Sequence, residues 1–330
     1  METGKQYFSE IRSQFKKAWP LTLLTGTACF LTLIYCLRPN SFAIVTFLPA
    51  WGWLLLMVPM LPFLRRKYLF PVILCGLAWL VFALLHIEEP KTMLRGLLNP
   101  VKSTKSPDAL RLMSVNCAAG NPVALCEIKS WNPDIVFLQE SPPRKEIENL
   151  ARDLFGVHGA FVHDIDSSIV VKGNLRSLHR PKGPPFFSLG VSTLPGVGEV
   201  ILVSLRLYPS IASFELWDPR CWRSQTSLRL AQLQQMEQLV AMLDTTKPMI
   251  IAGDFNAPPD DKIFNLLPGK LYDSFRAQGR GIGNTIANDM PLLRIDQIWV
   301  SHEFTTLQSF AVKNSASDHR MVISDVRMKR

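Results

Sequence analysis

Hydrophobic residues are concentrated in the first quarter of the chain, where three long stretches carry no Asp, Glu, Lys or Arg. They cover residues 18–37, 39–64 and 68–87. About 20 apolar residues in a helix span the hydrocarbon core of a bilayer. We therefore predict a membrane anchor over residues 1–87, with three transmembrane helices at about 18–37, 42–64 and 68–87.

Two other interpretations of these stretches are a cleaved signal peptide and a buried helical hairpin. A signal peptide would account for the first stretch only, and Leu33-Ile34-Tyr35-Cys36 lacks the small residues of a cleavage or lipid-attachment site. The two later stretches would still need a membrane.

Positive charge predicts the orientation of this anchor. Four basic residues precede the first stretch, Arg38 alone follows it, and Arg65-Arg66-Lys67 separates the second stretch from the third. Basic loops stay on the cytoplasmic side. With three crossings, the chain after His86 is expected on the non-cytoplasmic side of an integral membrane protein, periplasmic or extracellular if the host is a bacterium.

The pattern changes after the third stretch. Residues 88–109 are polar and contain three prolines, which predicts a linker. From Leu110 to Arg330 short apolar runs alternate with amphipathic segments, so this part is predicted to be one domain of mixed α and β structure. We expect strands at 110–116, 134–139, 168–171, 187–193, 200–207, 271–275, 294–301, 304–312 and 321–327, a further strand ending at Asp254, and helices at 122–131, 144–154, 225–243 and 261–267.

Several of these apolar runs end in polar residues suited to metal or phosphate chemistry. The run Ile250–Asn256 delivers Asp254 and Asn256 two positions apart, and side chains two apart on a strand lie on the same side. Four more fragments follow the same design: Leu112–Asn116, Asp134–Glu140, Arg294–Val300 and Ser317-Asp318-His319.

In order and spacing these five fragments resemble the endonuclease/exonuclease/phosphatase superfamily, over roughly Leu110–Arg330. The resemblance implies an α+β fold, a two-layered β-sandwich flanked by helices, here preceded by the three transmembrane helices. It also implies a metal-dependent hydrolase that acts on phosphate esters. Gly279–Thr285 resembles the family's glycine-rich turn and is expected to form a mobile loop near the site.

Phosphate ester hydrolysis needs a divalent cation to neutralise the phosphate oxygens and a base to generate hydroxide. Glu140 is the expected metal ligand. Asn116 is expected to hold the cation shell or a phosphate oxygen, and Asp318 to complete the metal or water network. Hard oxygen ligands with few carboxylates favour Mg²⁺ or Mn²⁺. A solvated strand end for Glu140 and a turn for Asn116 are the structural alternatives.

Asp254 is expected to orient or deprotonate the attacking water, and Asn256 to donate to the developing charge. The resemblance implies that His319 approaches the phosphate and pairs with Asp296, which favours the charged imidazolium. An Asx-type turn before Pro258-Pro259 is the alternative for Asp254 or Asn256, and a surface position is the alternative for His319.

Two features depart from the better-known members of the superfamily. Where the central strand usually reaches a histidine or tyrosine, this chain has Arg206, which could bind two phosphate oxygens at once or form a surface salt bridge. This difference weakens any transfer of nuclease activity in particular. The segment Trp217–Arg223 could line the site entrance, stack on a base or enter a lipid headgroup layer, or simply form a loop packed by its tryptophans.

Charge is distributed unevenly along the chain. Of 36 Lys and Arg residues 12 precede Leu110, as do 5 of 27 Asp and Glu residues, so the remainder holds 24 basic and 22 acidic residues. Such a domain lacks the strongly basic character of a dedicated nucleic-acid binder. The expected partners are the lipid bilayer and a phosphodiester substrate, either nucleic acid or a phospholipid headgroup, with no protein partner. A non-catalytic binding or scaffold module that retains the fold is the alternative.

Overall fold

The structure, a computed structural model, contains two compact units, Met1–Glu88 and Glu89–Arg330. It describes residues 18–65, 68–178, 186–194, 197–209, 215 and 217–329. The basic residues before position 18, together with Arg66 and Lys67, lie outside the described residues. The orientation predicted from them therefore stays a prediction.

The first unit contains two helices that are long and apolar enough to cross a membrane. These are α2 (Trp19–Leu37) and α4 (Leu69–His86). Large apolar side chains are exposed on both helices, for example Leu33 on α2 and Leu84 on α4. Such a surface is typical of helices that face lipid and argues against a buried hairpin.

The stretch between these helices is not the continuous span expected at 42–64. It consists of η1 (Asn40–Phe42), α3 (Ala43–Phe47) and η2 (Ala50–Phe63), and the segments before and after the break at 48–49 meet at an angle of 73°. Pro49 lies in the break, and proline disfavours a helical conformation in the residue before it, here Leu48. The unit therefore has two candidate spans, or three if the bent pair counts as one.

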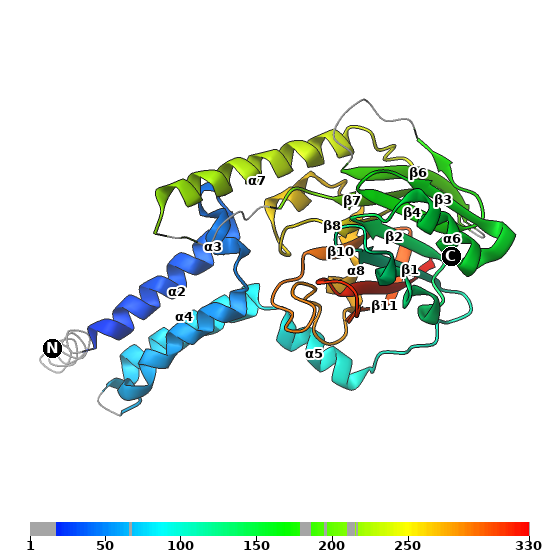
Figure 1. Cartoon of the computed structure of the whole chain (residues 1–330). Coiled ribbons are helices and arrows are strands. Elements are labelled where there is room, and N and C mark those ends of the chain that lie inside the picture. The colour runs from blue at the N-terminus through cyan, green and yellow to red at the C-terminus, as the bar shows by residue number, and fades with distance from the viewer. Residues whose placement is uncertain are drawn as a thin grey trace, which may run out of the picture. The chain divides into compact units, whose positions relative to one another are not determined.

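The second unit is built from two six-stranded sheets (Figure 1). Their strand orders are β11-β12-β1-β2-β4-β3 and β5-β6-β7-β8-β10-β9. The pairs β1–β2 and β7–β8 are parallel, and the other neighbouring strands are antiparallel. The strands are β1 (Leu110–Asn116), β2 (Ile135–Gln139), β3 (Gly159–His163), β4 (Ser167–Lys172), β5 (Arg176–Ser177), β6 (Phe187–Leu194), β7 (Gly198–Arg206), β8 (Met249–Asp254), β9 (Leu271–Asp273), β10 (Asp296–Ser301), β11 (Phe304–Val312) and β12 (Met321–Met328).

Alternating side chains on these strands create three apolar layers. Leu112 and Phe137 of the first sheet pack against Leu202, Ala252 and Ile298 of the second, and these residues form the core between the sheets. The outer face of the first sheet is covered by α6 (Arg144–Phe155), and that of the second by α7 (Pro219–Val240). The expected two-layered sandwich flanked by helices is confirmed.

Several elements differ from the sequence prediction. The expected helix at 122–131 is two short turns, η4 (Pro122–Leu125) and η5 (Ile128–Trp131), and the expected strand at 271–275 gives way after Asp273 to α8 (Ser274–Gln278). The remaining short turns are η6 (Gly156–His158) and η7 (Lys262–Leu266). The region predicted to be a linker begins with α5 (Glu89–Leu98), which belongs to the second unit.

Helix α7 begins earlier than expected. The Asp218 side chain accepts a hydrogen bond from Arg220 N, and Pro219 occupies the first turn, so the Trp217–Arg223 segment is mostly the start of this helix. Trp217 is 82% exposed. Helix α7 buries the apolar Met236 and Leu239 in the core, and it also buries polar residues, including Arg229 and Gln232. Leu228 and Ala231 are only half-buried.

Gly253 is required where β7 and β8 pair. It lies opposite Leu205 with φ of 150°, and a Cβ atom there would be 1.9 Å from the Leu205 carbonyl oxygen. Only glycine avoids both this overlap and the backbone strain. The residue that follows is Asp254, so this close approach helps to place a candidate site residue.

We expect Gly253→Ala to lower the free energy of unfolding by about 2–5 kcal/mol, because the methyl group forces β7 and β8 apart. Urea unfolding of the full chain in detergent micelles measures this. Gly269→Ala is the matched control, since a Cβ atom there meets nothing within 4 Å. It should change the value by less than about 0.5 kcal/mol. Equal unfolding curves for the two variants would show that the close approach does not constrain the fold.

Candidate active site

The candidate site lies at one end of the sandwich, where the inner faces of five strands change from apolar to polar. Each strand contributes one polar residue, an even number of positions away from the apolar residues that the same strand places in the core. They are Asn116 (β1), Gln139 (β2), Arg206 (β7), Asp254 (β8) and Asp296 (β10). Strand register places Arg206, Asp254 and Asp296 side by side across one sheet, and Asn116 opposite Gln139 in the other.

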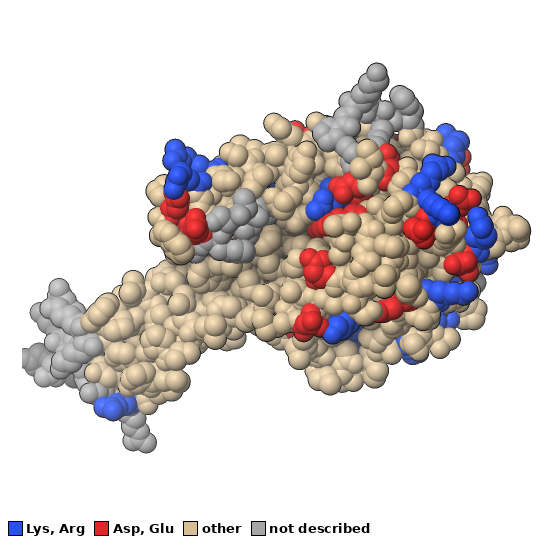
Figure 2. Space-filling view, viewed as in Figure 1, with Lys and Arg blue, Asp and Glu red and all other residues tan. Residues whose placement is uncertain are grey.

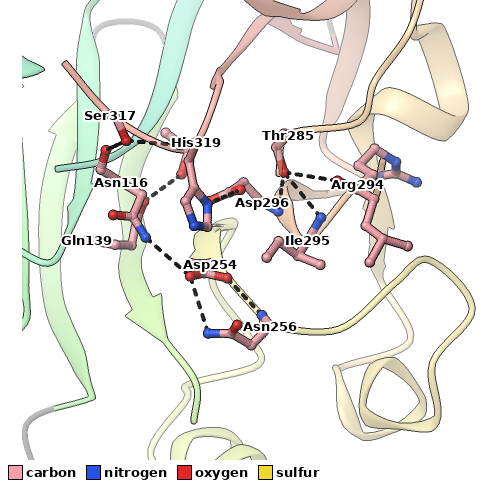
Figure 3. A network of polar contacts seen from close by, with 12 residues as sticks. Asn116, Gln139, Asp254, Asn256, Thr285, Arg294, Ile295, Asp296, Ser317 and His319 are labelled. Carbon is pink, nitrogen blue, oxygen red and sulfur yellow. Dashed lines mark hydrogen bonds and ion pairs between the residues drawn. The ribbon is translucent and has the colours of Figure 1, made fainter. Parts of the chain in front are cut away.

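Asp254 is buried at the centre of this group (Figure 3). Its Oδ1 accepts a hydrogen bond from Asn256 N at 2.9 Å, and its Oδ2 accepts from Asn116 Nδ2 and Asn256 Nδ2, both at 3.2 Å. Asn256 has φ of 47° and also donates to Leu207 O. The Asx-type turn is therefore present, and it serves to hold Asn256 against Asp254.

Asn116 links the two sheets. Besides its bond to Asp254, Asn116 Nδ2 lies 3.2 Å from Glu140 Oε1. Glu140 follows β2 directly and has φ of 48°, a left-handed conformation that is strained for a glutamate. This turn directs the Glu140 carboxylate back toward Asn116. The side chains of Glu140, Asn116 and Asp254 therefore contact one another in that order.

His319 and Asp296 form a buried pair. His319 Nδ1 lies 2.8 Å from Asp296 Oδ2, and Ser317 fixes the loop by accepting from His319 N and donating to Asn116 O. Burial lowers the pKa of His319, but the charge and hydrogen bond of Asp296 outweigh it and raise the pKa to about 10. The imidazole is therefore a cation near neutral pH.

Asp254, Asp296 and His319 form a group whose ligand atoms all lie within 4.8 Å of one another. Burial, together with the negative charge of Asp296, raises the pKa of Asp254 to about 7. Asp296 Oδ1 is buried and has no hydrogen-bond partner among the described residues. The group could hold a metal ion, and it has negative charge that its own hydrogen bonds do not fully compensate.

Arg206 lies next to Asp254 in the sheet and pairs with two acidic side chains. Its Nη2 lies 3.1 Å from Glu140 Oε1, and its Nη1 lies 3.5 Å from Asp166 Oδ2. The side chain is 31% exposed. Arg206 thus forms salt bridges, as one interpretation made from the sequence expects, and does so beside the candidate site. Its binding of phosphate stays a prediction.

Asp318 lies apart from the buried group. Its side chain is exposed, and its backbone carbonyl accepts a hydrogen bond from Asn288 N. The structure thus brings Asn116, Glu140, Arg206, Asp254 and Asn256 into direct contact, and pairs Asp296 with His319. Asp318 adjoins them only through its neighbour in the chain.

The comparisons with known proteins agree with this geometry. The model of the "Endonuclease/Exonuclease/phosphatase family" matches residues 113–319, more than half of the chain. The chain belongs to the endonuclease/exonuclease/phosphatase family. None of the curated proteins compared with the chain matches it.

Several solved structures are similar to the chain at low sequence identity. An endonuclease/exonuclease/phosphatase from Beutenbergia cavernae is 18% identical, with a TM-score of 0.51 over 67% of this chain and 72% of that one. A family protein from Bacteroides thetaiotaomicron is 16% identical, with a TM-score of 0.50 over 68% of this chain and 100% of that one. A mannosyl-6-phosphatase from the same species is 16% identical, with a TM-score of 0.47 over 66% of this chain and 99% of that one.

Sequence reasoning missed several residues that support the site of this endonuclease/exonuclease/phosphatase domain. Asp166 was missed because it lies between two strands that carry no motif. Gln232 of α7 donates to Asn256 O at 3.1 Å, and Thr285 Oγ1 accepts from Asp296 N at 3.2 Å. Gln139 Nε2 donates to Ser204 Oγ and joins the sheets beneath the site. The Gln-Glu pair at the end of β2 was the one available signal for Gln139.

We expect Asp296→Asn to lower the pKa of His319 from about 10 toward its ordinary value of 6.5, because the imidazolium loses its paired charge. NMR titration of the full chain labelled at histidine, in detergent micelles with EDTA, measures this shift. The His319→Gln variant assigns the resonance. Asp318→Asn is the matched control and should lower the pKa much less, since that carboxylate is exposed. Equal effects of the two variants would contradict the pairing.

Proposed function

We propose that this chain is a membrane-anchored, divalent-metal-dependent phosphoesterase that hydrolyses phosphodiester or phosphomonoester bonds. The observation that supports it most is the double contact of Asn116 with Glu140 and Asp254, beside the His319–Asp296 pair. A single buried end of the sandwich thereby provides oxygen ligands, a base and a cationic donor. These are the groups that phosphate ester hydrolysis requires.

Glu140 and Asn116 are the residues that would hold a cation, and the exposed Asp318 would complete the metal or water network from its edge. A charged His319 donates hydrogen bonds and does not ligate a metal ion, which favours this side of the site over the Asp254, Asp296 and His319 group. The oxygen ligands suit Mg²⁺ or Mn²⁺. When bound, such an ion neutralises phosphate oxygens and lowers the pKa of water.

The remaining residues divide the proton and charge chemistry between them. Asp254 takes the proton of the attacking water, and its raised pKa makes it a stronger base than an ordinary carboxylate once it is ionised. Asn256 and the His319 imidazolium donate to the charge that develops on the phosphate oxygens. Asp296 holds His319 charged and correctly turned.

Arg206 is proposed to bind the phosphate of the substrate. Substrate oxygens would then compete with Glu140 and Asp166 for the guanidinium, which can bind two oxygens at once. The family usually has a histidine or tyrosine on this strand, so Arg206 favours a substrate whose phosphate is accessible and strongly anionic.

We expect Arg206→Ala to lower kcat/KM about 10- to 100-fold, because a hydrogen-bonded charge pair with the phosphate is lost. Arg206→Lys should restore part of the loss. The control is Arg152→Ala, which removes an exposed arginine of α6 that pairs with Glu148. The assay uses a chromogenic phosphoester with the full chain. A specificity constant that stays unchanged in Arg206→Ala would exclude a role in substrate binding.

The substrate class within this proposal is either nucleic acid or a phospholipid headgroup. Acidic and basic side chains are interspersed on the face of the second unit seen in Figure 2, and the face has no uniform basic surface among the residues coloured there. A nuclease usually contacts the phosphate backbone of its substrate with a continuous basic surface. The observation favours the lipid headgroup.

The anchor is proposed to place the second unit outside the cytoplasm. Helices α2 and α4 are apolar enough to span a bilayer, and the bent segment between them could supply a third crossing. An odd number of crossings is required for the proposed orientation, because the basic N-terminal residues favour the cytoplasm.

The deciding experiment is hydrolysis by the full chain of a panel containing plasmid DNA, RNA, phospholipid and chromogenic phosphomonoesters and diesters. We expect turnover that needs Mg²⁺ or Mn²⁺, stops with EDTA and falls about 10²- to 10⁴-fold in Asp254→Asn. The preferred substrate separates the nuclease branch from the lipid branch. Binding of nucleic acid or lipid in EDTA, without turnover of any substrate when metal is added, would instead indicate a non-catalytic module.

A further inference from the structure

Helix α5 presents its apolar side chains outward. Met93, Leu94, Leu97 and Leu98 are 47%, 57%, 79% and 71% exposed, whereas Thr92 on the same helix is 3% exposed. A surface helix of a globular domain normally buries its apolar stripe and exposes its polar one. In α5 this arrangement is reversed.

Polar and backbone groups hold α5 in this orientation. Gly281 N donates to Thr92 O at 3.0 Å, and Arg95 Nη1 donates to Gly279 O at 3.2 Å. Gly96 lies so close to the same loop that a Cβ atom on it would be 2.8 Å from Gly281 N. The helix is therefore fixed to the loop 279–293 by contacts that leave its leucines exposed.

The loop beneath α5 adds further exposed apolar side chains. Ile282 is 43% exposed and Met290 is 68% exposed. Together with Met93, Leu94, Leu97 and Leu98 they define what we call the apolar face, carried by α5 and the loop that contacts it. Figure 1 shows this loop, in orange, next to the cyan α5. Grouped exposed apolar residues of this kind mark an interaction surface.

The chain itself indicates what covers the apolar face. The candidate span α4 ends at His86 and α5 begins at Glu89, so only Ile87 and Glu88 separate them. Three residue steps reach at most about 10 Å. The start of α5 therefore stays within about 10 Å of the end of the candidate span, which is in or next to the headgroup layer. An exposed Lys91 on α5 suits the anionic groups of that layer.

We propose that the apolar face lies in the interfacial layer of the same bilayer that α2 and α4 span, so that α5 acts as an interfacial helix. The consequence for the site is direct. Thr285 and Ile286 belong to the loop that carries α5; Thr285 accepts from Asp296 N, and Ile286 forms a bridge with His319. The candidate site is thereby tied to the membrane surface through one loop, whatever reaction it performs.

Photo-crosslinking of the full chain tests this proposal. p-Benzoylphenylalanine replaces Leu97 in the apolar face, Leu77 on α4 as the positive control, or Val157, which is 95% exposed on the second unit, as the negative control. Each protein is reconstituted into phosphatidylcholine and phosphatidylglycerol vesicles that contain radiolabelled lipid. The thermal unfolding midpoint of each variant confirms that it is folded before irradiation.

We expect Leu97 and Leu77 to take up lipid label at least about fivefold more than Val157. Label at Leu77 with none above the Val157 level at Leu97 would overturn the proposal, as would label at none of the three. A crosslink between two chains at Leu97 would also overturn it, because a second copy would then cover the apolar face. None of these results depends on finding the substrate, so failure here is separate from failure of the phosphoesterase proposal.

Discussion

The site depends on the contact of one amide with two carboxylates. Asn116 extends from the end of β1 and reaches Glu140 in its own sheet and Asp254 in the opposite sheet. Glu140 also pairs with Arg206 and accepts from Ala119 N, and Asp254 also accepts from Asn256. The amide adds one neutral donor that both carboxylates share, and buried acidic groups are costly unless they are hydrogen-bonded. It thereby links the polar ends of the two sheets.

The remaining polar groups follow from the charge at this end of the sandwich. Four carboxylates, from Glu140, Asp166, Asp254 and Asp296, surround two cationic side chains, Arg206 and His319. Negative charge is therefore in excess at this site. The pKa of Asp254 is raised, and His319 is held in its charged form. The first shift favours one negative charge fewer and the second keeps one positive charge, so both make the net charge of the site less negative, as a bound divalent cation would.

The parts of this fold that follow from strand alternation could be predicted from the sequence. A polar residue at one end of an apolar run locates Asn116 and Asp254, which end their strands, and Asp296, which begins its strand, without any tertiary information. The same period of two places the core and the site. Contacts between distant segments could not be predicted in this way. Asp166 contacts Arg206 only after the two sheets pack. The span expected at 42–64 is broken next to Pro49, and a count of apolar residues does not take proline into account.

The composition of residues 88–109 does not predict helix α5. This region contains three prolines and a polar run, which are typical of a linker, and the ten helical residues do not change that average. The helix changes the meaning of that region. Most of a flexible linker would make no fixed contacts, whereas α5 is held to the loop 279–293 by the hydrogen bonds from Gly281 N to Thr92 O and from Arg95 Nη1 to Gly279 O. Only two residues separate it from α4. If the apolar face rests on the bilayer, phosphate esters at the membrane surface have a much higher effective concentration at the site than those in solution. A short, structured connection thus favours the membrane as the source of substrate, independently of the near-neutral charge of the catalytic part.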